Sequence, residues 1–159
     1  MATPDDKRML AYIRVCDNPA KLRQIIENAR KRDAKELAEA AFRKLVSIVP
    51  AEEPGTLEHD FWQSIQAFEY VLTEENGRTT RLSRTRQKVQ RVGILQTLAD
   101  WAIALKESDG FRMLIERGMP DLSGEAVILR HPDRFEPHIV VAAHERISAA
   151  EIPPSSSEA

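Results

Sequence analysis

Residues 57–76 read LEHDFWQSIQAFEYVLTEEN, and this stretch decides the fold class. Its large apolar side chains recur three or four residues apart, at Leu57, Phe61, Ile65, Phe68 and Leu72. That spacing places them on one face of an α-helix. The pair Asn76-Gly77 is typical of a helix C-terminus. The stretch therefore predicts a long amphipathic helix that buries one face in a core.

The residues before this helix predict a helical hairpin. Asn18-Pro19 is typical of a helix start, with a capping side chain followed by proline at the first helical position. Residues 19–49 then carry two apolar stripes at helical spacing, separated near Asp33. The stripes are Leu22, Ile25, Ile26 and Ala29, and then Leu37, Ala41, Leu45 and Ile48. An earlier helix is expected over 4–15.

The residues after 77 also have helical patterns. Further helices are expected over 83–92, 95–105, 109–117, 123–130 and 137–150. Gly93 separates the first two of these, which gives a pair similar to a helix–turn–helix. A short β-hairpin near 126–142 is the alternative, because β-branched residues gather there. Helix is favoured, since Ile139, Ala143 and Ile147 lie four residues apart.

These elements predict an all-α protein. The prolines, glycine and acids of PAEEPGT, residues 50–56, predict a linker. The expected organisation is a helical hairpin subdomain over 1–49, the linker, and a multi-helix bundle over 57–150. Residues 151–159 are rich in proline and serine, and a disordered tail is expected there.

The net charge of −2 conceals alternating blocks of charge. Residues 51–77 hold seven acids and no lysine or arginine. Residues 78–91 hold six basic side chains and no acid. We call residues 78–91 the basic segment. Its local charge density makes it the best candidate contact surface.

The basic segment has the chemistry that phosphate recognition requires. Guanidinium groups bind phosphate oxygens in pairs of hydrogen bonds, and hydroxyls add donors. On a helix, Arg81, Arg84, Lys88 and Arg91 would share an arc of about 80°, with Leu82, Val89 and Val92 beside it to pack on the core. The candidate nucleic-acid-binding residues are Arg78, Thr79, Thr80, Arg81, Ser83, Arg84, Arg86, Lys88 and Arg91.

The expected partner of this surface is duplex DNA or structured RNA. Stacking aromatic residues, which single-strand binders use, are missing from the segment. The first alternative is a protein–protein adaptor, in which the basic face or the 19–49 hairpin docks an acidic partner or a second copy. The second is a solvated face neutralised by the acids of 51–77.

Motifs for catalysis or metal binding are absent from the sequence. His144-Glu145 begins like a zinc-protease motif, but Ser148 stands where the second histidine belongs. His59, between two acids, is expected to be exposed. No cofactor and no metal are expected. A motif-free enzyme is the third alternative, with Glu69, Glu74 and Glu75 as its centre.

The expected location is cytoplasmic, without membrane contact. The one cysteine, Cys16, cannot form an internal disulfide. The longest apolar run is only a few residues, well short of the roughly 20 that a membrane helix needs.

Overall fold

The computed structural model describes residues 3–151, and the regular elements in that range are all helical. The predicted all-α class is confirmed. The β-hairpin alternative near 126–142 is wrong, because helix α7 (Gly124–Arg130), a 3-10 turn (Pro132–Arg134) and helix α8 (Pro137–Glu151) occupy this region. Pro132 and Pro137 each begin a new helical segment, as their fixed φ angle favours.

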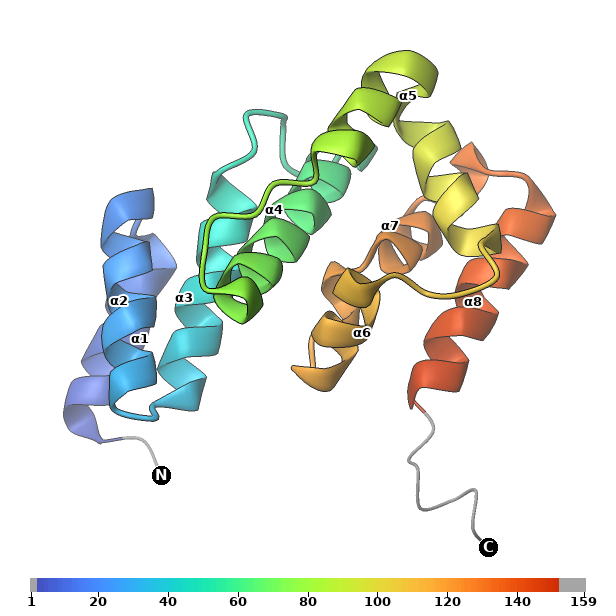
Figure 1. Cartoon of the computed structure of the whole chain (residues 1–159). Helices are drawn as coiled ribbons and strands as arrows, with labels where there is room; N and C mark the ends of the chain where they lie inside the picture. The colour runs from blue at the N-terminus through green and yellow to red at the C-terminus, as the bar shows by residue number, and fades with distance from the viewer. Residues whose placement is uncertain (1–2, 152–159) are drawn as a thin grey trace, which may run out of the picture. The chain divides into compact units, whose positions relative to one another are not determined.

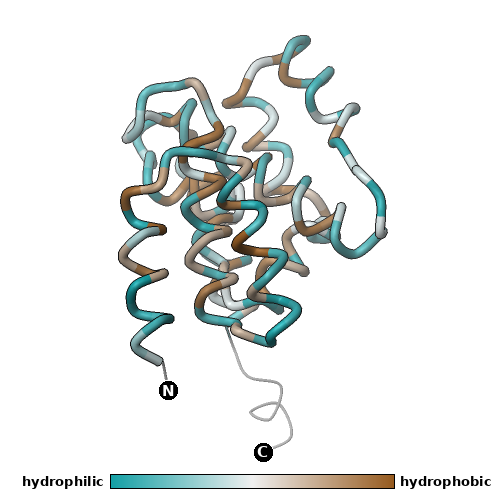
Figure 2. The backbone as a smooth tube through the Cα atoms, turned by 90° about the vertical axis from the view of Figure 1, so that its left-hand side faces the viewer, coloured by the Kyte–Doolittle hydropathy of each residue, from teal (hydrophilic) through white to brown (hydrophobic). Residues whose placement is uncertain are grey.

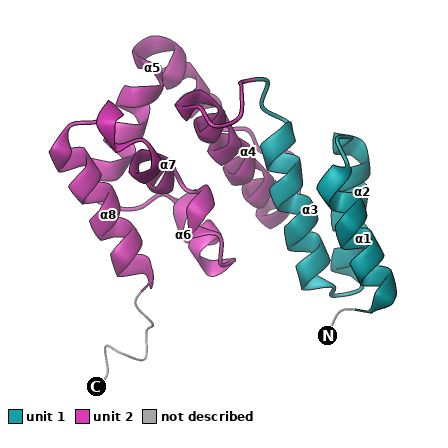
Figure 3. Ribbon diagram, turned by 180° about the vertical axis from the view of Figure 1, so that it is seen from behind, with its two compact units in different colours: residues 1–51 teal, residues 52–159 magenta. Residues whose placement is uncertain are grey.

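The chain divides into two compact units, Met1–Ala51 and Glu52–Ala159 (Figure 3). The boundary falls inside the segment 50–56, which was expected to be a linker. The predicted disordered tail lies outside the described residues apart from Glu151, which is the last residue of α8.

The first unit contains three helices, α1 (Pro4–Val15), α2 (Pro19–Lys31) and α3 (Lys35–Ile48). The predicted hairpin corresponds to α2 and α3, and α1 packs on α3 as well. Asn18 caps α2, since its side chain accepts a hydrogen bond from the Lys21 N–H at 3.2 Å. The predicted stripes face inward, with Leu22, Ile26, Ala29, Leu37, Ala41 and Leu45 buried.

The second unit is built on α4 (Leu57–Asn76), which matches the predicted long helix. Of its predicted apolar face, Leu57, Phe61, Ile65 and Phe68 are buried and Leu72 is half-buried. Helices α5 (Ser83–Ile103), α6 (Asp109–Glu116), α7 and α8 complete the bundle (Figure 1). Hydropathy alternates along the chain, as amphipathic helices require (Figure 2).

An aromatic cluster forms the centre of the second unit. Trp101 of α5 stacks on Phe61 of α4 with ring centroids 5.8 Å apart, and it meets Phe68 edge-on at 5.8 Å. Two glycines make room for these rings. A Cβ atom on Gly110 would lie 2.6 Å from the Phe68 ring, and one on Gly124 would overlap Trp101. The core therefore depends on small residues in α6 and α7.

Helix α5 is two helical segments joined at Gly93. The backbone of Gly93 has φ 89° and ψ 169°, a conformation open almost only to glycine. Figure 1 shows α5 bending sharply part-way along its length. The predicted break at Gly93 is present in the structure. The segment before it, residues 83–92, contains no buried side chain, whereas Thr97, Leu98 and Ala102 of the second segment are buried.

Candidate nucleic-acid interface

The loop from Gly77 to Leu82 is held to the end of α4 by threonine hydrogen bonds. Gly77 ends α4 in the left-handed conformation, with φ 71°. The Thr80 N–H then donates to Thr73 Oγ1 at 2.9 Å. The Thr80 hydroxyl accepts from Asn76 Nδ2 at 3.0 Å and donates to the Arg78 carbonyl at 3.1 Å. Thr80, predicted as a contact residue, therefore has a structural role in the loop.

Glu69 fixes the start of α5. Its side chain is 9% exposed and accepts a hydrogen bond from the Leu82 N–H at 2.8 Å. The same carboxylate receives the Arg86 guanidinium in two hydrogen bonds, at 2.9 Å and 2.7 Å. The Arg86 guanidinium also lies 5.4 Å from the centroid of the Trp62 ring. These contacts orient the helix, and the hydrogen bonds that Arg86 donates to Glu69 raise the pKa of Arg86 above its ordinary value.

A second ion pair closes the bend in α5. Lys88 Nζ lies 2.5 Å from Asp100 Oδ2. In a straight α-helix, residues twelve apart would be separated by about 18 Å along the axis. Only the bend at Gly93 brings these two together. The Lys88 hydrogen bond, followed by one from Gln96, holds the pKa of Asp100 below its ordinary value.

Four arginines of the basic segment remain exposed and unpaired. Within residues 3–151, Arg78, Arg81, Arg84 and Arg91 take part in no ion pair. Most other basic side chains of the second unit have acidic partners. The pairs outside the basic segment are Arg112–Asp109, Arg117–Glu74, Arg130–Asp60 and Arg146–Glu125. Unpaired positive charge is therefore concentrated around the loop and the first segment of α5.

The four cations predicted to share one helix face, Arg81, Arg84, Lys88 and Arg91, do not all lie on it. Arg81 lies in the loop before Ser83, the first helical residue, so it does not share the helix face. Lys88 is turned towards Asp100, and only Arg84 and Arg91 project from the exposed side. Val92, expected to pack on the core, is 44% exposed. Leu82 and Val89 do pack against the core, as predicted.

Thr79 and Ser83 are exposed beside the arginines. Of the nine predicted contact residues, six therefore form one accessible group, and three hold the structure together. The accessible group is Arg78, Thr79, Arg81, Ser83, Arg84 and Arg91, which we call the arginine surface. Thr80, Arg86 and Lys88 are the structural three.

The acids of 51–77 cover little of the basic segment. Glu69 pairs with Arg86, but Glu74 pairs with Arg117 at 2.7 Å, and Asp60 receives Arg130 at 3.3 Å. Glu69 and Glu74, proposed above as part of a motif-free active centre, are thus both bound in ion pairs. Among residues 3–151, the arginine surface forms no ion pair with this block.

The histidines give no metal centre among residues 3–151. His59 is buried at 5% exposure, so its predicted exposure is wrong. The residue is enclosed because it lies on the inward side of α4. His131 Nε2 lies 2.7 Å from Asp60 Oδ2, which also receives Arg130, and so ties the end of α7 to the start of α4.

A buried carboxylate lies at the other end of α5. Glu125 is 3% exposed and lies 3.5 Å from Arg146. Burial raises its pKa, and Arg146 opposes this effect. Arg146 also donates to the Trp101 and Ala104 carbonyls at the end of α5. Glu125 and Arg146 therefore anchor the end of α5 to α7 and α8.

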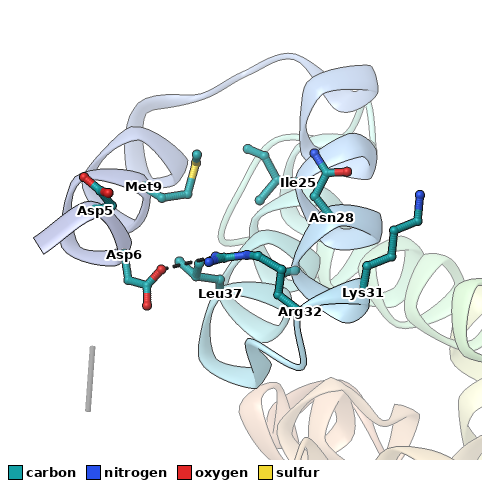
Figure 4. Close-up of a pocket in the computed structure, with 9 residues that line it drawn as sticks. Asp5, Asp6, Met9, Ile25, Asn28, Lys31, Arg32 and Leu37 are labelled. Atoms are coloured by element: carbon teal, nitrogen blue, oxygen red, sulfur yellow. Dashed lines mark hydrogen bonds and ion pairs between the residues drawn. The ribbon is translucent and has the colours of Figure 1, made fainter. Parts of the chain in front are cut away.

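The first unit has an open groove of about 560 Å³ between α1 and α2 (Figure 4). Its floor is apolar and includes Met9, Ile25 and Leu37. Its rim is charged, and an ion pair between Arg32 and Asp6 at 3.2 Å crosses one end. The groove offers an apolar surface with charges of both signs around it.

Comparisons with known proteins give no relative: no family model matches the chain, and no curated protein or solved structure is similar to it. In the described part of the chain, no helix combines the length and apolar character needed to cross a membrane.

Two acids organise this interface, and the sequence pattern did not predict their roles. Asp100 pairs with Lys88, and Glu69 pairs with Arg86. Asp100 is twelve residues from Lys88, beyond the three or four that link side chains along one helix. The signal that could have found it was Gly93, because a break in the helix brings distant positions together. No comparable signal pointed to the Glu69–Arg86 pair.

Proposed function

We propose that the protein is a non-enzymatic nucleic-acid-binding or regulatory module that contacts phosphates through its arginine surface. The proposal rests on one observation above others: four arginines are exposed and unpaired within fourteen residues, while most neighbouring cations are neutralised. Unpaired guanidinium groups can each bind phosphate oxygens without first breaking an internal ion pair. The proposal includes the cytoplasmic location expected from the sequence.

The way the arginine surface is held supports this function. The hydrogen bonds from Leu82 and Arg86 to Glu69 fix the loop and the start of α5 before any ligand binds. The Lys88–Asp100 pair holds the other end of this segment. A backbone that is fixed before binding loses less conformational entropy on binding than a flexible one. The exposed hydroxyls of Thr79 and Ser83 add donors for phosphate oxygens.

The preferred ligand is a duplex. The exposed residues of the basic segment include no aromatic side chain on which unpaired bases could stack. Contacts to phosphates alone would tolerate any sequence, and would weaken steeply as salt rises.

A titration of labelled duplex DNA, single-stranded DNA and RNA at two salt concentrations tests the proposal. Each ligand is added to the wild type and to the variant Arg78→Ala/Arg81→Ala/Arg84→Ala/Arg91→Ala. We expect salt-sensitive duplex binding by the wild type, and at least a tenfold loss in the variant. Equal binding by both proteins, or no salt-sensitive binding by the wild type, would contradict the proposal.

A protein–protein adaptor is the second candidate, and the groove in the first unit is the observation that favours it. An apolar floor with a charged rim is the kind of surface that receives an amphipathic helix. A second copy of the chain or an acidic protein is the proposed partner. Light scattering over a range of protein concentrations tests self-association. A monomer at all concentrations would leave only the acidic partner.

A further inference from the structure

We infer that the exposed face of residues 83–91 reads base edges in the major groove of duplex DNA, with Gln87 and Gln90 as its specificity-determining residues. This inference rests on the proposed function and adds sequence recognition to it. The phosphate-binding arginines would position the helix, and the two glutamines would distinguish one sequence from another.

The geometry of α5 singles out this face. At 100° per residue, five positions fall within an arc of about 120°. They are Ser83, Arg84, Gln87, Gln90 and Arg91, and all five are exposed. The half-buried Val89 lies on the opposite side, packed against the core. The helix thus presents a face made of arginine, glutamine and serine.

The side chains of this face are available for contacts. Within the described residues, the side chains of Gln87 and Gln90 form no hydrogen bond, and Arg84 and Arg91 have no ion pair. In contrast, Gln96 and Gln24 are bonded to Asp100 and Asn28, at 2.8 Å and 3.0 Å. The two glutamines of the exposed face can therefore offer both their donor and their acceptor to a ligand.

Base chemistry matches these residue types. Glutamine can form two hydrogen bonds with adenine in the major groove, whereas the arginines of this face contact the bordering phosphates. The segment 83–92 is about 15 Å long, and the major groove of B-DNA, about 12 Å wide, admits an α-helix. The segment has no buried side chain, so it stands at the surface of the unit.

The same geometry favours DNA over duplex RNA. The major groove of A-form RNA is deep and narrow, and side chains cannot read it. The arginines of the preceding loop, Arg78 and Arg81, lie at the N-terminal end of the helix, where they can contact the phosphates that border the groove. The inference therefore commits to B-form DNA.

Selection from a randomised duplex library tests whether the protein has a preferred sequence. We expect an enriched motif that contains adenine, the base that glutamine recognises. The affinity for the selected duplex and for a scrambled duplex is then measured for the wild type and Gln87→Ala/Gln90→Ala. We expect the double variant to lose about tenfold in preference for the selected duplex, while its affinity for scrambled DNA changes by less than about twofold.

Two control variants separate the possible failures. Gln24→Ala replaces an exposed glutamine in the first unit and should keep the preference. Arg78→Ala/Arg81→Ala should lower the affinity for the selected and the scrambled duplex by the same factor, because phosphate contacts carry no sequence information. Circular dichroism checks that the helices persist; alanine favours helix at exposed positions.

The outcomes are distinguishable. DNA binding without an enriched motif, or a preference unchanged in the double glutamine variant, would overturn the inference and leave the proposed function standing. Equal affinity for a selected duplex and its RNA counterpart would also overturn it. No binding to any DNA would overturn both the inference and the proposed function.

Discussion

Glu69 accepts hydrogen bonds from the Leu82 N–H and from the Arg86 guanidinium, 13 and 17 residues further along the chain. A buried carboxylate needs such donors, because burial without them costs several kcal/mol. The Arg86 guanidinium also lies over the Trp62 ring. A single acid in α4 thus joins the loop and the first segment of α5 to the core.

Replacement of Glu69 by alanine should destabilise the second unit by about 2–3 kcal/mol. The change removes hydrogen bonds to a charged group and leaves Arg86 without its partner. Urea unfolding followed by circular dichroism measures the effect. Glu75→Ala is the matched control, since Glu75 is exposed on the same helix, and we expect a change within about 0.5 kcal/mol. Similar losses in both variants would contradict the role given to Glu69.

The buried Glu125 should make the stability of the protein depend on pH. Burial raises its pKa in the folded state above the ordinary value of 4.5. The folded state therefore binds more protons than the unfolded state in the range above pH 4.5. The contribution of Glu125 to stability is largest below that pH and falls as pH rises through the folded pKa.

Glu125→Gln should remove this part of the pH dependence, because glutamine does not titrate. The free energy of unfolding is measured at pH 5 and pH 7 for the wild type, for this variant and for Glu116→Gln, which changes an exposed acid. We expect the decrease from pH 5 to pH 7 to be smaller in Glu125→Gln alone. An unchanged or steeper decrease would show that Glu125 is not the source.

Among the helices, α5 has the feature that matters most for the site, which is its bend at Gly93. The sequence pattern predicted both segments and the break between them, because glycine at a helix interruption is a strong local signal. The pattern also predicted which side of α4 is buried. It gave the wrong position for Arg81 and Val92, since an ideal helix was extended over residues that lie outside the segment or beside the break.

Gly93→Ala should destabilise the protein by about 1–3 kcal/mol, because an L residue is strained at φ 89° and ψ 169°. The variant should also weaken the Lys88–Asp100 pair, which exists only across the bend. Thermal unfolding measures the first effect. Val92→Ala changes the exposed neighbour and should have little effect. Equal melting temperatures for the wild type and Gly93→Ala would contradict this account of the bend.

For the whole molecule, the sequence was sufficient for the fold class and for most helix boundaries. Helix periodicity and caps such as Asn18-Pro19 are local, and they can be found without coordinates. The division of the basic segment into structural and accessible residues could not be predicted. It depends on Glu69 and Asp100, which meet their partners only after the helices pack. The burial of His59 was missed for the same reason.

We propose that positive charge in this protein is functional where it is exposed, unpaired and carried by the loop and helix of residues 78–91. Among residues 3–151, Lys106 and Arg134 are exposed basic residues elsewhere in the second unit that take part in no ion pair. They make a matched comparison with Arg84 and Arg91, because each pair removes the same total charge when changed to alanine.

The most direct test is the salt dependence of duplex DNA binding for the wild type, Arg84→Ala/Arg91→Ala and Lys106→Ala/Arg134→Ala. We expect the slope of log affinity against log salt to fall by about 2 in the first variant, since each lost phosphate contact removes about 0.9. The second variant should keep the wild-type slope. Equal slopes in both variants, or no salt-dependent binding by the wild type, would contradict the central claim.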